Sequence, residues 1–271
     1  MSTQSPQPIP AAPPAPPPYT PPHGLLTGKT AIVTAAAGTG IGAATARRFL
    51  EEGASVLISD LHARRLAETV EELEQVTGTR PFATVCDVTQ QSDVENLIET
   101  ALDTFHGIDI LVNNAGLGGT AALVEMVDEQ WHKVLDVTLT ATMRVTRAVL
   151  PAMYRAGRGA IVNNASVLGW RAQVGQAHYA AAKAGVMALT RSAAMEAAPH
   201  GVRVNAVAPS LALHPFLAKV TSEELLAELS AREAFGRPAL PWEVANVIAF
   251  LASDYATYMT GEVVSVSSQH P

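Results

Sequence analysis

The stretch TAIVTAAAGTGIG, residues 30–42, joins a short apolar strand to a helix through a glycine-rich turn. Glycine lets the chain turn sharply and brings backbone N–H groups close to a pyrophosphate at the helix N-terminus. Because a strand precedes the turn and a helix follows it, the stretch predicts a dinucleotide site rather than an ordinary tight turn. The residues that we expect to contact a cofactor here are Thr34, Gly38, Thr39, Gly40, Ile41 and Gly42.

Strands and helices alternate along the rest of the chain. The expected strands are Thr30–Thr34, Ser55–Ser59, Phe82–Cys86, Ile108–Val112, Ala160–Asn164, Arg203–Val207 and Val263–Val266. The expected helices are Ile41–Glu52, Arg64–Thr77, Ser92–Phe105, Asp128–Ala152 with Asp128 as N-cap, Gly175–Ala198 and Pro241–Leu251. This order predicts one α/β domain over residues 25–271, a Rossmann-type doubly wound parallel sheet with helices on both faces. Ligands of such sheets bind beyond the carboxyl ends of the strands.

The amino-acid composition limits the kinds of partner and the cellular setting that we expect. The formal charge of −7 argues against a nucleic acid or an anionic membrane surface. Cys86 is the only cysteine, so the chain cannot form an internal disulfide, which suits a reducing cytoplasm. We expect no metal site. Ten of the first 22 residues are proline, and we expect residues 1–24 to be a disordered tail, with a ligand for a proline-binding module as the alternative.

The candidate catalytic centre is the pair Tyr179 and Lys183, four residues apart, with Ser166 thirteen residues before the tyrosine. Positions four apart share one face of a helix, so the ammonium of Lys183 can lie beside the phenol of Tyr179. A neighbouring cation is expected to lower the pKa of the phenol, which prepares it to exchange a proton with an alcohol oxygen. Ser166, at a strand end, can donate a hydrogen bond to the same oxygen. The three residues predict the interconversion of an alcohol and a ketone.

Further candidate cofactor contacts follow the later strands. Asp60 comes 18 residues after Gly42, where a carboxylate accepts the hydroxyls of the adenosine ribose and repels the extra phosphate of NADP, so we expect NAD. Asp87 is placed to bind the adenine amino group, or simply to cap a turn. The remaining candidates at strand ends are Val88, Asn114, Ala115, Gly116 and Pro209.

Taken together, these motifs resemble the short-chain dehydrogenase/reductase family from Leu25 to Ser268. The resemblance implies that Tyr179 is the acid/base, that Ser166 orients the reacting oxygen, and that Lys183 binds the nicotinamide ribose. It also implies a homo-oligomer, a dimer or tetramer. Thr138 stands where most members place an asparagine that holds a water in the proton relay, and Asn163 or Asn164 is the candidate to compensate. The phosphate turn is one residue longer than usual, with Ala35 in place of its first glycine.

Within that family, the chain resembles most closely an actinobacterial branch that acts in steroid catabolism on a hydroxy-methyl-oxo-hexahydroindene carboxyl-CoA. The alternatives are a 3-oxoacyl-thioester reductase and, outside enzymes, a non-catalytic dinucleotide-binding protein. Residues 211–238 carry many apolar side chains and predict a lid over a hydrophobic or acyl-CoA substrate, unless those side chains pack on the protein body or on another subunit. The expected pocket residues are Ser166, Leu168, Trp170, Gln176, Leu211 and Phe216.

Overall fold

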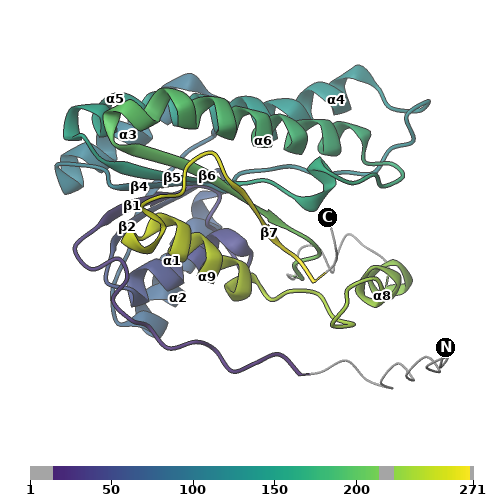
Figure 1. Ribbon diagram of the computed structural model, residues 1–271, viewed down its shortest axis with the longest axis horizontal. Coiled ribbons are helices and arrows are strands. Elements are labelled where there is room, and N and C mark those ends of the chain that lie inside the picture. Colours follow the sequence, from purple (N-terminus) through teal and green to yellow (C-terminus); the bar gives the residue numbers. More distant parts are fainter. Residues whose placement is uncertain (1–14, 214–222, 269–271) are drawn as a thin grey trace, which may run out of the picture.

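The computed structural model describes residues 15–213 and 223–268. Its core is a seven-stranded sheet in the order β3-β2-β1-β4-β5-β6-β7, with every neighbouring pair parallel (Figure 1). The predicted fold class is therefore confirmed, and the strand bounds differ from the expected ones by at most a few residues. The strands are β1 (Thr30–Val33), β2 (Ser55–Asp60), β3 (Phe82–Val85), β4 (Ile110–Asn113), β5 (Gly159–Asn164), β6 (Val202–Pro209) and β7 (Val263–Val266).

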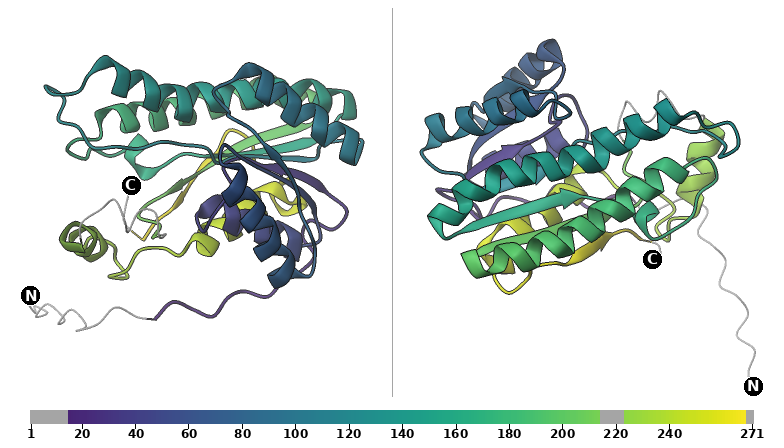
Figure 2. Two further views of the ribbon diagram at one scale, coloured as in Figure 1. Left: turned by 180° about the vertical axis from the view of Figure 1, so that it is seen from behind. Right: turned by 90° about the horizontal axis from the view of Figure 1, so that it is seen from above.

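Two layers of helices cover the sheet (Figures 1 and 2). One layer consists of α1 (Ile41–Glu51), α2 (Ala63–Thr77) and α9 (Pro241–Ala252), which share a buried core with β1 and β2. The other contains α3 (Gln91–Phe105), α5 (Ala141–Ala156) and α6 (Ala177–Ala197), packed on the opposite face. The strands are buried on both faces because parallel crossovers put a helix on each side. The short helix α8 (Glu223–Ala231) lies at the carboxyl end of the sheet (Figure 1).

The helix expected over Asp128–Ala152 is divided by a π-helical turn. It consists of α4 (Asp128–Leu135), the π turn Asp136–Thr140 and α5, which continues past Pro151 to Ala156. The N-cap is Val127 rather than Asp128, and the backbone N–H of Val127 donates to Gln130 Oε1 at 3.3 Å. A π turn inserts an extra residue into a helix and is common at functional sites. Here it carries Thr138.

Residues 19–24 do not form the expected disordered tail. The Tyr19 hydroxyl donates to Glu51 at 2.5 Å, and the Tyr19 ring meets Trp242 of α9 edge-on with centroids 5.4 Å apart. Arg48 and Glu52 form a buried ion pair at 2.5 Å. Arg48 also donates to the carbonyl of Thr20 at 2.6 Å, while Glu52 accepts the backbone N–H groups of His23 and Leu25, both at 2.9 Å. This segment therefore lies along α1 and α9; residues 1–14 lie outside the described part.

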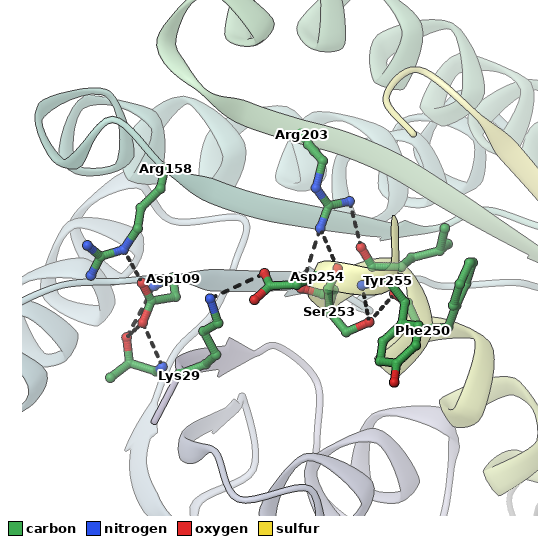
Figure 3. Close-up of polar contacts among 11 residues, drawn as sticks. Lys29, Asp109, Arg158, Arg203, Phe250, Ser253, Asp254 and Tyr255 are labelled. Carbon is green, nitrogen blue, oxygen red and sulfur yellow. Dashed lines mark hydrogen bonds and ion pairs between the residues drawn. The ribbon is translucent and has the colours of Figure 1, made fainter. Parts of the chain in front are cut away.

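The amino ends of the strands carry a separate cluster of charges around a depression of about 510 Å³ (Figure 3). Lys29 pairs with Asp254 at 3.4 Å, and Arg158 pairs with Asp109 at 2.8 Å. Arg203 donates to the last carbonyls of α9, including Leu251 O at 2.8 Å. The Lys29 and Arg203 contacts fasten the end of α9 to the sheet, and the Arg158–Asp109 pair joins the starts of β5 and β4, so we assign this end a structural role. Within residues 15–213 and 223–268, no helix is long and apolar enough to cross a membrane.

Candidate active site

The glycine turn forms an open cradle at the N-terminus of α1. A side chain at Gly42 would collide with the carbonyl of Ala35 at 2.4 Å and with the amide of Asn114 at 2.5 Å, so only glycine fits there. At Gly38 and Gly40, in contrast, no atom lies within 4 Å of the position a Cβ would take. The backbone is thus exposed where a pyrophosphate would approach, and the N-terminus of α1 favours an anion. Ala35, in place of a glycine, adopts a left-handed φ of 50°.

Two side chains hold this longer turn in place. Asp60, buried at the end of β2, accepts the N–H of Ala37 at 3.2 Å and that of His62 at 2.9 Å. Thr69 of α2 accepts the N–H of Gly38 at 2.8 Å, which removes that donor from a bound phosphate. Sequence reasoning missed Thr69, because nothing in a helical threonine signals a partner 31 residues away. Asp60 retains lone pairs for ribose hydroxyls, since a carboxylate accepts about four hydrogen bonds.

The other predicted cofactor residues border the same strand ends. Asp87 accepts the backbone N–H of Thr89 at 2.9 Å and its hydroxyl at 2.7 Å, so it acts as a turn cap here, and its contact with adenine stays a prediction. Thr34 at the end of β1 receives the N–H groups of Asn114 (3.0 Å) and Ala115 (3.3 Å). Pro209 ends β6, and Val88 is buried.

Four asparagines connect β4 and β5, and only two of them face the site. Asn113 donates to Asn163 and Asn163 donates to Thr190, both at 2.9 Å, in a fully buried network behind the sheet. Asn164 instead donates to Asn114 Oδ1 at 2.9 Å, and Asn114 donates to the carbonyl of Ala35 at 3.0 Å. Of the two residues expected to compensate for Thr138, Asn163 is thus committed to the core, and Asn164 lies beside the cofactor turn.

The structure brings Ser166, Tyr179 and Lys183 together. Ser166 follows β5 and caps the 3-10 turn Val167–Gly169, where its hydroxyl accepts the N–H of Leu168 at 3.2 Å, and the same hydroxyl lowers the pKa of the Tyr179 phenol. Lys183 is 3% exposed, and its Nζ lies 5.6 Å from the centre of the Tyr179 ring. The same Nζ donates to the backbone carbonyl of Asn164 at 2.5 Å. One face of α6 therefore presents the phenol and the amine to the end of β5, as their spacing predicted.

The pKa of Tyr179 differs from expectation. Burial raises the pKa of Tyr179, and the Ser166 hydroxyl opposes this only in part. Burial also lowers the pKa of Lys183 to about 8. The expected lowering by the lysine fails in the protein alone because the surrounding loops desolvate both groups and the ammonium donates to a carbonyl instead of the phenol. At neutral pH the phenol is protonated, which suits it to donate a proton.

Thr138 acts on the loop that follows β4. Its hydroxyl accepts the N–H of Leu117 at 3.0 Å and donates to the carbonyl of the same residue at 3.2 Å. A Cβ at Gly116 would lie 3.3 Å from Lys183 Nζ, and one at Gly118 would lie 3.8 Å from the Tyr179 ring. Both hydrogen-bonding functions of Thr138 are thus used to hold this glycine-rich loop against the tyrosine and the lysine.

The predicted pocket residues divide into three groups. Leu168 and Leu211 are partly buried, Trp170 is 43% exposed, and their contact with substrate stays a prediction. The side chain of Gln176 is used within the protein, because its Nε2 donates to the carbonyl of Gly119 at 2.8 Å. Phe216 and much of the predicted lid, residues 214–222, lie outside the described residues. Among the described residues, no group of three His, Cys, Asp or Glu side chains could hold a metal ion.

Comparison with known proteins agrees with this geometry. A family model described as "Enoyl-(Acyl carrier protein) reductase" matches residues 35–268. The crystal structure of a short chain dehydrogenase from Mycobacterium smegmatis is 56% identical, with a TM-score of 0.84 over 94% of this chain and 98% of that one. The chain belongs to the short-chain dehydrogenase/reductase family, whose members use NAD or NADP, and it is an oxidoreductase acting on a CH–OH group.

Individual relatives are also similar over nearly their whole length. A (5R,7aS)-5-hydroxy-7a-methyl-1-oxo-2,3,5,6,7,7a-hexahydro-1H-indene-carboxyl-CoA reductase of Mycobacterium tuberculosis is 61% identical over 92% of this chain and 95% of its own. A 3-oxoacyl-(acyl-carrier-protein) reductase of Thermotoga maritima is 40% identical over 89% and 97%. A variant of actinorhodin polyketide ketoreductase, solved with NADPH, is 35% identical over 88% and 95%, with a TM-score of 0.84.

Proposed function

We propose that this protein is an NAD-dependent reductase of a ketone carried on a hydrophobic CoA thioester, and that the reverse oxidation uses the same residues. The observation that supports this most is the cluster of Ser166, Tyr179 and Lys183, with the pKa of Tyr179 raised by burial. A phenol that stays protonated at neutral pH is a proton donor, which is what the reduction of a ketone requires.

Each residue has a separate role in this mechanism. Tyr179 gives its proton to the carbonyl oxygen of the substrate, and Ser166 donates a hydrogen bond to the same oxygen, which favours its developing negative charge. The ammonium of Lys183 compensates the charge left on the phenolate. Thr138 positions the loop after β4 rather than reacting itself, because the only proton of its hydroxyl is donated to the carbonyl of Leu117.

A nicotinamide dinucleotide, when bound, supplies the hydride. The open backbone at Gly38 and Gly40 suits a pyrophosphate, and Asp60 suits the adenosine ribose, so the chain fits such a cofactor. Lys183 would bind the nicotinamide ribose, with Asn114, Ala115, Gly116 and Pro209 lining the path between. We favour NAD because the carboxylate of Asp60 repels a 2′-phosphate; the relative solved with NADPH makes NADP the alternative.

The substrate proposal rests on the relative that is 61% identical, a hexahydroindene-carboxyl-CoA reductase. A 3-oxoacyl thioester is the second candidate, since a 40% identical relative reduces that class. We also propose a dimer or tetramer in a reducing cytoplasm, a setting that suits a chain with one buried cysteine.

The test is an assay of NADH oxidation with the ketone of an indene-carboxyl-CoA ester and, in parallel, with straight-chain 3-oxoacyl-CoA esters. We expect kcat/KM to be at least about tenfold higher for the indene ester, a difference of about 1.4 kcal/mol. A preference for straight chains would replace the proposed substrate by the second one. Binding of NADH without turnover of any ketone would instead support a non-catalytic dinucleotide-binding protein.

A further inference from the structure

Helix α6, which carries Tyr179, begins without a side-chain cap from its N-cap residue. That residue is Gln176, whose side chain makes no capping hydrogen bond. Its amide is used instead on the carbonyl of Gly119 and the hydroxyl of Thr120. The N–H of Ala180 donates to the carbonyl of Gln176 at 2.8 Å and is the first N–H bonded within the helix. The earlier N–H groups of α6, including that of Tyr179, therefore need other acceptors.

His178 supplies the acceptor for Tyr179. The backbone N–H of Tyr179 donates to Nδ1 of His178 at 2.9 Å. An N–H in the first turn of a helix is usually bonded by a Ser, Thr, Asp or Asn side chain at the N-cap. Here an imidazole inside the helix, one residue before the tyrosine, takes that role. The bond holds the backbone of the same residue whose phenol is the candidate proton donor.

The bond also determines which nitrogen of His178 carries a proton. A neutral imidazole has one N–H donor and one acceptor, and a ring nitrogen that accepts an N–H has no proton of its own. Nδ1 is therefore unprotonated, and the single proton lies on Nε2. An imidazolium would have donors on both nitrogens and would place a positive charge at the positive end of the α6 dipole, so it would break this contact.

The imidazole has little freedom to leave this position. His178 is 2% exposed, and a Cβ at Gly119 would lie 3.6 Å from its Nε2, so the loop after β4 closes over the ring. A Cβ at Gly118 would likewise lie 3.8 Å from the ring of Tyr179. The same two glycines thus approach the imidazole and the phenol ring. Burial between α6 and this loop keeps Nδ1 of His178 where it meets the N–H of Tyr179.

We propose that His178 is a positioning residue for the reaction: its unprotonated Nδ1 fixes the backbone of Tyr179 and, through it, the place of the phenol relative to the carbonyl oxygen of the substrate. This inference rests on the proposed role of Tyr179 as proton donor and adds a residue to it. A proton donor works only within hydrogen-bond reach of the acceptor, and a displacement of about 1 Å can lower a rate about a hundredfold.

Three variants of His178 separate the hydrogen-bond acceptor from the bulk of the side chain. His178→Asn places an amide oxygen where Nδ1 lies, so it can keep the bond to Tyr179. His178→Gln carries its amide one carbon further out, in the place of Nε2, and His178→Leu has no acceptor. The Gln variant keeps a polar side chain, so the comparison does not depend on the folding of the Leu variant. The matched controls are His132→Asn and His132→Leu, because His132 is exposed on α4.

Two measurements are made on each protein. Amide hydrogen exchange, resolved by residue in the cofactor-free protein, measures the protection of the Tyr179 N–H. Steady-state kinetics measure kcat and KM for the ketone ester that wild type reduces, and fluorescence titration measures the affinity for NADH.

The Leu and Gln variants of His178 should differ from wild type in both measurements. We expect exchange at Tyr179 to speed up at least about tenfold, because its N–H loses its acceptor. Their kcat should fall about ten- to a hundredfold, while KM and the affinity for NADH stay within about twofold. His178→Asn and both His132 variants should stay within about threefold of wild type in every quantity.

The outcomes separate positioning from a general effect on the helix. Exchange that speeds up equally at Tyr179 and at later amides of α6, such as that of Lys183, would assign His178 to the stability of α6 alone and overturn the inference. A wild-type kcat in the Leu and Gln variants would also overturn it, as would an Asn variant that is as impaired as they are.

The proposed function can fail independently of this inference. If wild type binds NADH but reduces no ketone, the proposed function is wrong, while exchange at Tyr179 still decides whether His178 fixes its backbone. If wild type is active and the Leu and Gln variants are equally active, the function stands and only the positioning role of His178 is rejected.

Discussion

The ammonium nitrogen of Lys183 lies 5.6 Å from the centre of the Tyr179 ring, one turn along α6, and donates its hydrogen bond to the carbonyl of Asn164. The lysine is thus near the phenol without being its hydrogen-bond partner. The hydroxyl of Ser166 lowers the pKa of the phenol in part, while burial raises it. This arrangement keeps the phenol protonated at neutral pH and leaves a cation close enough to compensate the phenolate that forms when the proton leaves.

Replacing Tyr179 by phenylalanine removes the proton donor and little else. We expect kcat to fall by a factor of about 10² to 10⁴, the usual contribution of a positioned acid. Because Phe keeps the ring that packs beside Gly118, NADH affinity and thermal stability should change little. Steady-state kinetics measure kcat, fluorescence titration measures the affinity for NADH, and thermal denaturation measures stability. Turnover near the wild-type rate would remove Tyr179 from the mechanism.

Lys183 is predicted to lower the free energy of unfolding although the activity requires it. Burial lowers the pKa of Lys183 from 10.5 to about 8, so the folded protein binds this proton less tightly than the unfolded chain. The cost is therefore complete below about pH 8 and fades as pH rises toward 10.5, where the unfolded chain also loses the proton. Lys183→Met should raise the free energy of unfolding at pH 7 by about 1–2 kcal/mol, after the lost bond to Asn164 is subtracted.

The measurement is urea denaturation of wild type and Lys183→Met at pH 7 and at pH 10. The stabilisation should shrink at the higher pH, while activity is lost at both. A variant that is less stable than wild type at pH 7 would show that the bond to Asn164 outweighs the burial of the charge.

Thr138 is expected to act through the loop that it holds. Thr138→Val keeps the size of the side chain but leaves the N–H and carbonyl of Leu117 without their partner, which should cost about 1–3 kcal/mol of stability. We expect kcat to fall more than KM rises, because the loop packs on Tyr179 and Lys183. Thr138→Ser retains the hydroxyl and is the control; if it is as impaired as the valine variant, the hydroxyl is not what matters.

Much of the fold follows from local pattern. Short apolar runs separated by amphipathic helices predict the sheet, and a four-residue spacing places Tyr179 and Lys183 on one helix face. What the sequence did not reveal depends on distant partners. Thr69 meets Gly38 only because α2 packs beside the turn, and the π turn at Thr138 cannot be distinguished by periodicity from a continuous helix. The direction of the Tyr179 pKa shift depends on desolvation by several loops, which no local motif encodes.

Asp60 is the predicted selector between NAD and NADP. Asp60→Asn removes the charge that opposes a 2′-phosphate, and Arg65, whose guanidinium lies 3.8 Å from this carboxylate, becomes available to the phosphate. We expect the ratio of kcat/KM for NADH to that for NADPH to fall at least about tenfold, or roughly 1.4 kcal/mol. Asp103→Asn removes the same charge from the exposed surface of α3 and should leave the ratio unchanged.

The segment before β1 is predicted to stabilise the fold without affecting the chemistry. Tyr19 contacts Glu51 through its hydroxyl, Trp242 through its ring edge and Arg47 through its ring face, with the guanidinium 4.6 Å from the ring centre. Tyr19→Ala should lower the free energy of unfolding by about 2–3 kcal/mol, because one hydrogen bond to a charged group and the aromatic contacts are lost.

Tyr258→Ala is the matched control, because Tyr258 is fully exposed, and it should stay within about 0.5 kcal/mol of wild type. Denaturation curves measure both variants, and kcat should stay within about twofold of wild type because Tyr19 lies on α1 and α9, away from Tyr179. Equal stability of the two variants would mean that the contacts of residues 19–24 with α1 and α9 do not stabilise the fold.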